Sequence, residues 1–203
     1  MAKLYYQGHG SYRITTAQGT VIYVDPAMGD GYDVPADIVI VTHEHADHNQ
    51  VQLVPKKATC VVWRAADMLK DGVYQTLNHL DVTVHAVQAC NKNHPIDKCV
   101  GCIITLDGKK IYAAGDTSRT EDMEKRLPQE KLDYALLPID GVYNMGPEEA
   151  SECARLIGAK HTIPVHSSPT GVAKPHLLWD EAQARRMDAP GLMLVRNGES
   201  VTL

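Results

Sequence analysis

The sequence predicts an α/β fold in which helices cover layered β-sheets. Short runs of β-branched and aromatic residues, separated by Gly, Pro and Asp, dominate the first half of the chain and are typical of strands. Helical patterns lie between such runs in the second half. With 203 residues, of which 44% are hydrophobic, the chain is long enough for one core, so we expect a single domain over residues 1–203.

Each apolar run predicts one strand. The continuously apolar runs are expected to be buried on both faces of a sheet, and the turn residues between runs mark the connections. The predicted strands lie at residues 11–16, 20–24, 37–42, 59–63, 81–87, 101–106, 110–114, 133–137 and 161–165.

The clearest helix is predicted over residues 146–160. Pro147 suits a first helical position, and the two glutamates that follow it complement the positive end of the helix dipole. Gly158 can end the helix in a left-handed conformation. A second helix is predicted over residues 174–189, which also begin near a proline.

The last predicted element is a hairpin. Asn197-Gly198 lies between two strand-like runs, and this dipeptide favours a type I′ turn. We therefore expect residues 192–203 to fold back on themselves as two paired strands.

A dense group of metal-ligand side chains follows the third predicted strand, in the sequence THEHADH. His43 and His45 are two residues apart in an extended chain, which turns both side chains to the same side. Asp47 and His48 follow where we expect a helix over residues 46–54, and there they can face a second ion beside the first. Imidazole with carboxylate is the ligand set that zinc and similar divalent ions prefer.

Other ligand-type side chains lie where further apolar runs end. Asp25 and His166 directly follow their runs, and Asp116 follows a run of small residues that permit close backbone approach. His94 lies in a loop between two predicted strands, and His85 within a strand is its alternative. Because loops at a sheet edge carry function more readily than strand interiors, we expect His94 to be the ligand.

These segments resemble the metallo-β-lactamase superfamily. The sequences GHGSYRI, VDP, THEHADH, NHP, YAAGDT, ALLPIDGVYNMGPEEA and IPVHSS occur in the order seen there, from about Gly8 to His166. The branch that the chain resembles, through GHGS and LLPIDGVYNM, is that of the small metal-dependent hydrolases related to ascorbate-6-phosphate lactonase. The resemblance implies a four-layer αββα sandwich with a dinuclear metal site along one edge.

The resemblance also implies a role for each matching residue. Two sets of three ligands hold a first and a second ion, and one carboxylate bridges the ions. Two further residues lie beside the ligands and help to orient them. The matching positions are His43, His45 and His94 for the first ion, Asp47, His48 and His166 for the second, Asp116 for the bridge, and His9 and Asp25 for support.

The sequence departs from the family around the expected pocket. Relatives often carry His at the position of Ala113, Gly at that of Asp140 and an aromatic residue at that of Ser167. The pocket is therefore expected to differ from theirs, while the ligand set is retained. The candidate pocket residues are Tyr143, Asn144 and Met145, with Lys174 and His176 for an anionic group.

The predicted activity is metal-dependent hydrolysis. Two closely spaced divalent ions lower the pKa of a bridging water and polarise a carbonyl or phosphoryl oxygen. The bridging hydroxide is expected to attack a small lactone, ester, amide or phosphoester. Asp47 and Asp116 are the candidate catalytic residues, with Asp47 managing proton transfer to the leaving group. Zinc suits these ligands best, and manganese and iron also suit them.

Three other functions fit parts of the pattern. A phosphodiesterase or nuclease of the same fold is one, but a net charge of −5 without a basic block argues against nucleic acid as a partner. A flavin-coupled di-iron redox enzyme tends to carry Glu at the position of His45. A non-enzymic metal-binding protein is the third, although ligand sets with open positions are typical of catalytic sites.

The remaining features favour a cytoplasmic enzyme that acts on a small molecule. The N-terminus has no run of signal-peptide length, and no stretch of about 18 apolar residues occurs, so we expect no membrane span. The five cysteines are expected to be free thiols, and Cys99 and Cys102 are interpreted as packing residues. The sequence leaves the oligomeric state open, a homo-oligomer included.

Overall fold

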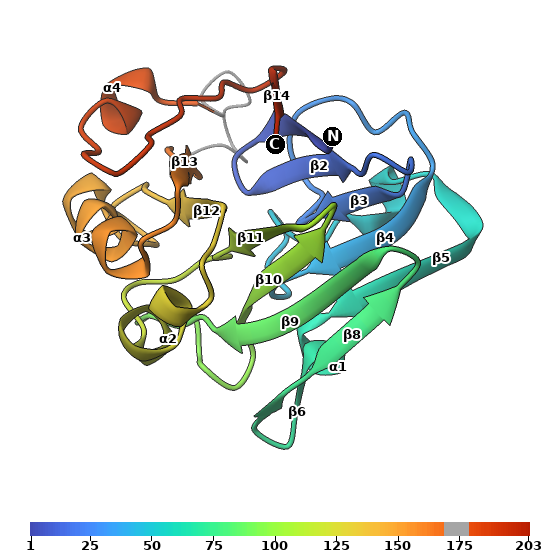
Figure 1. Ribbon diagram of the computed structural model, residues 1–203, viewed down its shortest axis with the longest axis horizontal. Helices are drawn as coiled ribbons and strands as arrows, with labels where there is room; N and C mark the ends of the chain where they lie inside the picture. Colours follow the sequence, from blue (N-terminus) through green and yellow to red (C-terminus); the bar gives the residue numbers. More distant parts are fainter. Residues whose placement is uncertain (169–178) are drawn as a thin grey trace.

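The computed structural model describes residues 1–168 and 179–203. Its main feature is a pair of six-stranded sheets that face each other (Figure 1). The first sheet has the strand order β14-β1-β2-β3-β4-β5. Its strands are β1 (Lys3–Gly8), β2 (Ser11–Thr15), β3 (Val21–Val24), β4 (Ala36–Val41), β5 (Lys56–Arg64) and β14 (Ser200–Thr202).

The second sheet has the order β13-β12-β11-β10-β9-β8, and β6 (Leu69–Lys70) pairs with β7 (Val73–Tyr74) in a separate ribbon. The strands of the second six-stranded sheet are β8 (Thr76–His79), β9 (Val82–Gln88), β10 (Val100–Leu106), β11 (Lys109–Ala113), β12 (Tyr134–Pro138) and β13 (His161–Val165). The helices are α1 (Ala65–Met68), α2 (Glu121–Lys125), α3 (Pro147–Ile157) and α4 (Glu181–Ala184), with 3-10 turns at Val51–Leu53 and Leu127–Gln129.

Alternation along the strands divides the core into layers. In β4, Ile38 and Ile40 pack between the two sheets, while Val39 and Val41 pack on the outer face of the first sheet, because successive side chains of a strand point to opposite faces. The outer face of the second sheet packs against α2 and α3 (Figure 1). The predicted layered α/β fold is confirmed.

The first sheet differs from its partner in what covers it. Tyr32 and Val34 pack on its outer face together with Val51 and Val54, which lie in and just after a 3-10 turn. The helix expected over residues 46–54 is therefore wrong: these residues form turns and this short 3-10 segment.

The longest helix forms as the sequence predicts. Pro147 takes the first helical position and Gly158 closes the helix with φ 67°. Of the second predicted helix, residues 174–178 lie outside the described residues, and among residues 179–189 only α4 is helical, so the prediction is wrong for most of this part. Lys174 and His176, named as pocket candidates, fall in the part that the structure does not describe.

The predicted C-terminal hairpin is wrong. The turn at Gly198 forms, but β14 pairs with β1 of the first sheet, where Leu4 faces Val201. The segment before the turn makes an isolated bridge from Leu192 to Thr162 of the second sheet instead. The segments on either side of the turn pair with the open edges of two different sheets instead of with each other, so tertiary contacts outweigh the local preference of Asn-Gly for a hairpin.

The strand directions bring the ends of several strands to one rim. β3, β4 and β5 run parallel in the first sheet, and β11, β12 and β13 run parallel in the second. Parallel strands end at the same edge of a sheet, and in α/β proteins this edge carries ligand sites. Within the described ranges, no helix is both long and apolar enough to cross a membrane.

Candidate metal centre

The candidate site is built from residues that directly follow these parallel strands. Asp25 follows β3, His43 follows β4 by two residues, and His166 follows β13. Asp116 comes three residues after β11. His94 joins them from the loop between β9 and β10, where it bridges with Asn91.

The first group of ligand-type atoms is entirely imidazole. His43, His45 and His94 each offer one nitrogen, and the three nitrogens lie within 4.8 Å of one another. The ring of His94 has its centroid 4.9 Å from the centroids of both other rings. His43 and His94 are buried, whereas His45 is exposed, so the group opens to solvent on one side.

The second group combines imidazole with carboxylate. His9, Asp47, His48 and His166 offer atoms that also lie within 4.8 Å of one another. His9 Nε2 lies 3.1 Å from Asp47 Oδ2, and the His9 and His166 ring centroids are 3.5 Å apart. The structure thus places His9 within the second group, whereas the sequence predicted it only as a supporting residue.

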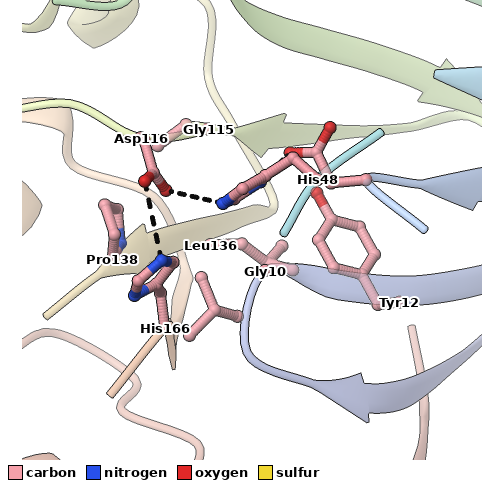
Figure 2. Close-up of a pocket in the computed structure, with 11 residues that line it drawn as sticks. Gly10, Tyr12, His48, Gly115, Asp116, Leu136, Pro138 and His166 are labelled. Carbon is pink, nitrogen blue, oxygen red and sulfur yellow. Dashed lines mark hydrogen bonds and ion pairs between the residues drawn. The ribbon is translucent and has the colours of Figure 1, made fainter. Parts of the chain in front are cut away.

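Asp116 lies between the two groups. Figure 2 shows its carboxylate directed at His48 and His166, with Oδ1 3.4 Å from His48 Nε2 and Oδ2 3.5 Å from His166 Nε2. Oδ2 also lies 3.3 Å from His94 Nε2 and 4.0 Å from His43 Nε2. One carboxylate therefore faces histidines of both groups.

The buried nitrogens are suited to metal ions. The Nε2 atoms of His43, His48, His94 and His166 are buried, and each has no hydrogen-bond partner among the described residues. Leaving a buried polar atom unpaired costs free energy. Four such atoms around one carboxylate fit divalent ions, which bind the lone pairs of deprotonated imidazole nitrogens.

The electrostatics of the two groups differ. Burial lowers the pKa of His43 to about 2, so this imidazole is neutral and ready to bind an ion at pH 7. Burial acts in the same direction on His48, but Asp116 and then Asp25 outweigh it and raise its pKa to about 9. Burial would raise the pKa of Asp116, yet His166 and His48 hold it well below its usual range.

Asp25 holds two residues of the site from behind. Its Oδ1 accepts a hydrogen bond of 2.7 Å from the Thr42 backbone N–H. Its Oδ2 accepts one of 2.7 Å from the Thr42 hydroxyl and lies 3.0 Å from His48 Nδ1. A carboxylate at Nδ1 fixes the tautomer and leaves Nε2 free for a metal, although Asp25 also forms a group of possible metal ligands with His43 and His48.

Three residues of the site have left-handed backbones. His9, Asp25 and His166 have φ values of 57°, 46° and 48°. Non-glycine residues adopt this conformation at a cost, and such strain gathers at functional sites. For His9 the surrounding contacts are specific, since its carbonyl accepts hydrogen bonds from the Tyr6 hydroxyl and the His166 N–H.

A cleft of about 300 Å³ opens on both groups. It contains the exposed edge of Asp47 and, from the pocket candidates, Tyr143. Asn144 and Met145 are buried beside the cleft, Met145 in the core under α3. The residues that line the cleft are His45, Asp47, Asn93, His94, Asp116, Tyr143 and His166.

The competing side chains lie apart from the cleft. His85 is in β9, where its ring contacts Thr76 and Arg126. All five cysteines are free thiols, and the candidate metal groups of the described residues contain none of them. Cys102 packs in the core between the sheets, with Sγ 3.6 Å from Met68 Sδ.

Sequence reasoning missed two residues that shape the site. A Cβ on Gly10 would lie 2.6 Å from His48 Cε1, so only glycine leaves room for this ring. Asp140, which the sequence marked only as a departure from relatives, follows β12 and has Oδ2 3.1 Å from His166 Nδ1. Its place directly after a parallel strand is the signal that could have found it.

Comparisons with known proteins agree with this geometry. Residues 3–166 match the model of a family described as a beta-lactamase superfamily domain. A UPF0173 metal-dependent hydrolase of Methanoculleus marisnigri is 33% identical over 98% of this chain and 96% of its own length. Another, of Geobacillus thermodenitrificans, is 29% identical over 99% and 100%.

A solved structure supports the fold. Igni18, a metallo hydrolase of Ignicoccus hospitalis, is 22% identical, and it matches with a TM-score of 0.73 over 98% of this chain and 97% of that one. The resemblance seen in the sequence motifs is thereby confirmed at the level of the superfamily. This chain belongs to the beta-lactamase superfamily, among the UPF0173 metal-dependent hydrolases.

Proposed function

We propose that this chain is a metal-dependent hydrolase whose site holds two divalent ions, zinc being the best fit. The observation that carries the proposal is the set of four buried, unpaired Nε2 atoms around the carboxylate of Asp116. The names of its relatives, which are metal-dependent hydrolases, support the same activity.

The donor atoms divide into two positions. Two ions bound there would supply a water of lowered pKa as the nucleophile and would polarise the oxygen of the bond under attack. Asp116 faces both positions and offsets the repulsion between the two positive charges. The residues proposed to hold the ions are His43, His45 and His94 in the first position, Asp47, His48 and His166 in the second, and Asp116 between them.

Asp47 is the residue proposed to move protons. Its side chain is 27% exposed, and it reaches the cleft. Burial alone would raise its pKa, but the hydrogen bond to His9 and the nearby His48 outweigh burial and lower the pKa. The carboxylate is therefore ionised at neutral pH. Asp47 can therefore accept a proton from the attacking water and pass it to the leaving group.

The cleft is suited to a small substrate. At about 300 Å³, it matches the lower end of small-molecule sites. We propose a lactone, ester, amide or phosphoester, cleaved beside Tyr143. The five free cysteines support a reducing, cytoplasmic setting.

The test begins with elemental analysis of protein purified without added metal. We expect up to two ions per chain, and a screen over lactones, phosphodiesters, thioesters and β-lactams should then find turnover that a chelator abolishes and zinc or manganese restores. The control is His48→Ala, which should lose turnover against every substrate. Protein that binds two ions but stays inactive across the screen would contradict the hydrolase, and protein that binds none would contradict the metal site.

A further inference from the structure

We propose that Asp140, Asn144 and Asn91 form a positioning bridge that links the two metal positions from behind. The bridge is a chain of side-chain contacts from His166, in the second position, to His94, in the first. It rests on the proposed metal-binding function, because it acts through the orientation of these two rings.

The bridge begins at the outer nitrogen of His166. Asp140 Oδ2 lies 3.1 Å from His166 Nδ1, and the Asp140 side chain is fully buried. A carboxylate at this nitrogen favours the proton on Nδ1 and thereby keeps Nε2 free to face Asp116. The same Oδ2 accepts a hydrogen bond of 2.8 Å from Asn144 Nδ2.

The middle of the bridge is Asn144. Its amide group donates to Asp140, and its Oδ1 accepts a bond of 3.3 Å from Asn91 Nδ2. Asn144 is only 8% exposed, so water competes little for these bonds. Its side chain has hydrogen bonds to neither histidine among the contacts of the described residues, which makes it the best place to test the bridge.

The bridge ends at the first position. Asn91 Oδ1 can only accept, so His94 Nδ1 donates to it across 2.9 Å. This contact leaves His94 Nε2 directed at Asp116, 3.3 Å away. The two rings that face the same carboxylate are therefore held, at their outer nitrogens, by one connected set of side chains.

The bridge also fixes one wall of the cleft. Asp140 Oδ1 accepts bonds of 2.7 Å from the backbone N–H groups of Val142 and Tyr143. The Tyr143 carbonyl in turn accepts a bond of 3.0 Å from Asn91 Nδ2. The carboxylate that orients His166 thus also sets the loop that places Tyr143 in the cleft.

Side chains that are joined by successive polar contacts are coupled to one another. Asn144→Ala is expected to weaken zinc binding at both positions, by about 10-fold to 100-fold as is usual for residues that orient ligands. Asn91→Ala should act chiefly on the first position, and Asp140→Asn chiefly on the second. The combined Asn91→Ala and Asp140→Asn loss should be smaller than the product of the single losses.

The experiment measures stepwise zinc affinities by competition with a coloured chelator, and cobalt spectra as a record of ligand geometry. Asn78→Ala is the control: Asn78 Oδ1 accepts a hydrogen bond from the Thr83 hydroxyl, and Asn78 does not line the cleft. Asn144→Asp keeps the volume of the side chain while placing an oxygen against Asp140. It should lose affinity as the alanine variant does, and it carries the test if Asn144→Ala fails to fold.

The outcomes separate the bridge from the metal site itself. If parent protein binds no zinc, the proposed function fails. If the parent binds two ions and Asn144→Asp keeps both affinities and the parental cobalt spectrum, the bridge alone is wrong. Loss at both positions in Asn144→Asp, with Asn78→Ala unchanged and melting temperatures of the metal-free proteins alike, is the expected result.

Discussion

The two halves of the molecule repeat one pattern of strand pairing, yet they supply ligands in different ways. From β1 to β5 the successive pairs are antiparallel, antiparallel, parallel and parallel. From β9 to β13 the order is the same. The first half places its four proposed ligands at 43–48, after one strand, whereas the second half takes His94, Asp116 and His166 from three separate connections.

The difference in how the two halves supply ligands shows which part of the site depends on local sequence. The ligands of the first half are close together in the chain. One turn, with the room that Gly10 leaves for the His48 ring, is nearly enough to orient their side chains. The ligands that follow the parallel strands of the second half meet only if these strands lie in the correct register. At these strand ends Asp140 contacts both His166 and Asn144. Each metal position nevertheless needs both halves, because His94 joins His43 and His45 in the first position, and His166 joins Asp47 and His48 in the second.

The largest effect is expected at Asp116, which faces both halves. Asp116→Ala should fold, keep at most about one ion and lose hydrolysis almost entirely, because the charge that offsets the repulsion between the ions is gone. Elemental analysis and thermal unfolding check this. Asp133→Ala, a carboxylate at the other end of the same sheet that pairs with Lys160, should retain both ions. Two retained ions and parental turnover in Asp116→Ala would end the bridging assignment.

The next effect separates the two metal positions. His166→Ala should empty chiefly the second position, while His43, His45 and His94 still fill the first, because these three nitrogens form their own group. His43→Ala should do the reverse. Metal stoichiometry after mild chelation measures both, and equal losses in the two variants would show that the positions are not separable.

A smaller effect is expected from crowding one ring. A Cβ at position 10 would lie 2.6 Å from His48 Cε1, so Gly10→Ala should displace this ring and weaken zinc at the second position by about 10-fold to 100-fold. Gly146→Ala is the control, because its Cβ meets nothing closer than 3.6 Å. Unchanged affinity in Gly10→Ala would mean that the ring has another place to go.

The pH dependence should also differ between the positions. The raised pKa of His48, about 9, means that this ring is protonated at pH 7 and must lose its proton to bind an ion. Affinity at the second position should therefore rise about tenfold per pH unit up to about pH 9. His43, with a pKa lowered to about 2, releases no proton, so the first position should change less. Stepwise zinc titrations between about pH 6.5 and about pH 9.5, a range that includes the pKa of His48, decide this.

The smallest effect is expected from the cysteines. Replacing both Cys99 and Cys102 by Ala should leave metal content unchanged, because neither belongs to a candidate metal group of the described residues. Their burial makes some loss of stability certain, about 1 kcal/mol or more. Elemental analysis at a temperature well below unfolding is the measurement, and the loss of one equivalent of metal would contradict it.

The errors in the sequence reading have physical causes. The turn at Asn197-Gly198 carries a strong local signal, but β1 and the second sheet offered its flanking segments better partners than each other. Residues 46–54 form turns instead of the expected helix, because Asp47 and His48 lie in a metal group and Val51 and Val54 cover the first sheet. Local propensity was outweighed by tertiary contacts in both cases.

The sequence alone determined most of the strands, the helix at Pro147–Ile157 and the residue types of a metal site, because these follow from local patterning and ligand chemistry. Tertiary structure decided which distant residues meet. The placement of Asp116 between the two groups and the contact of Asp140 with His166 depend on the packing of two sheets across their parallel strand ends. No spacing along the chain encodes such contacts, since they join segments that only folding brings together.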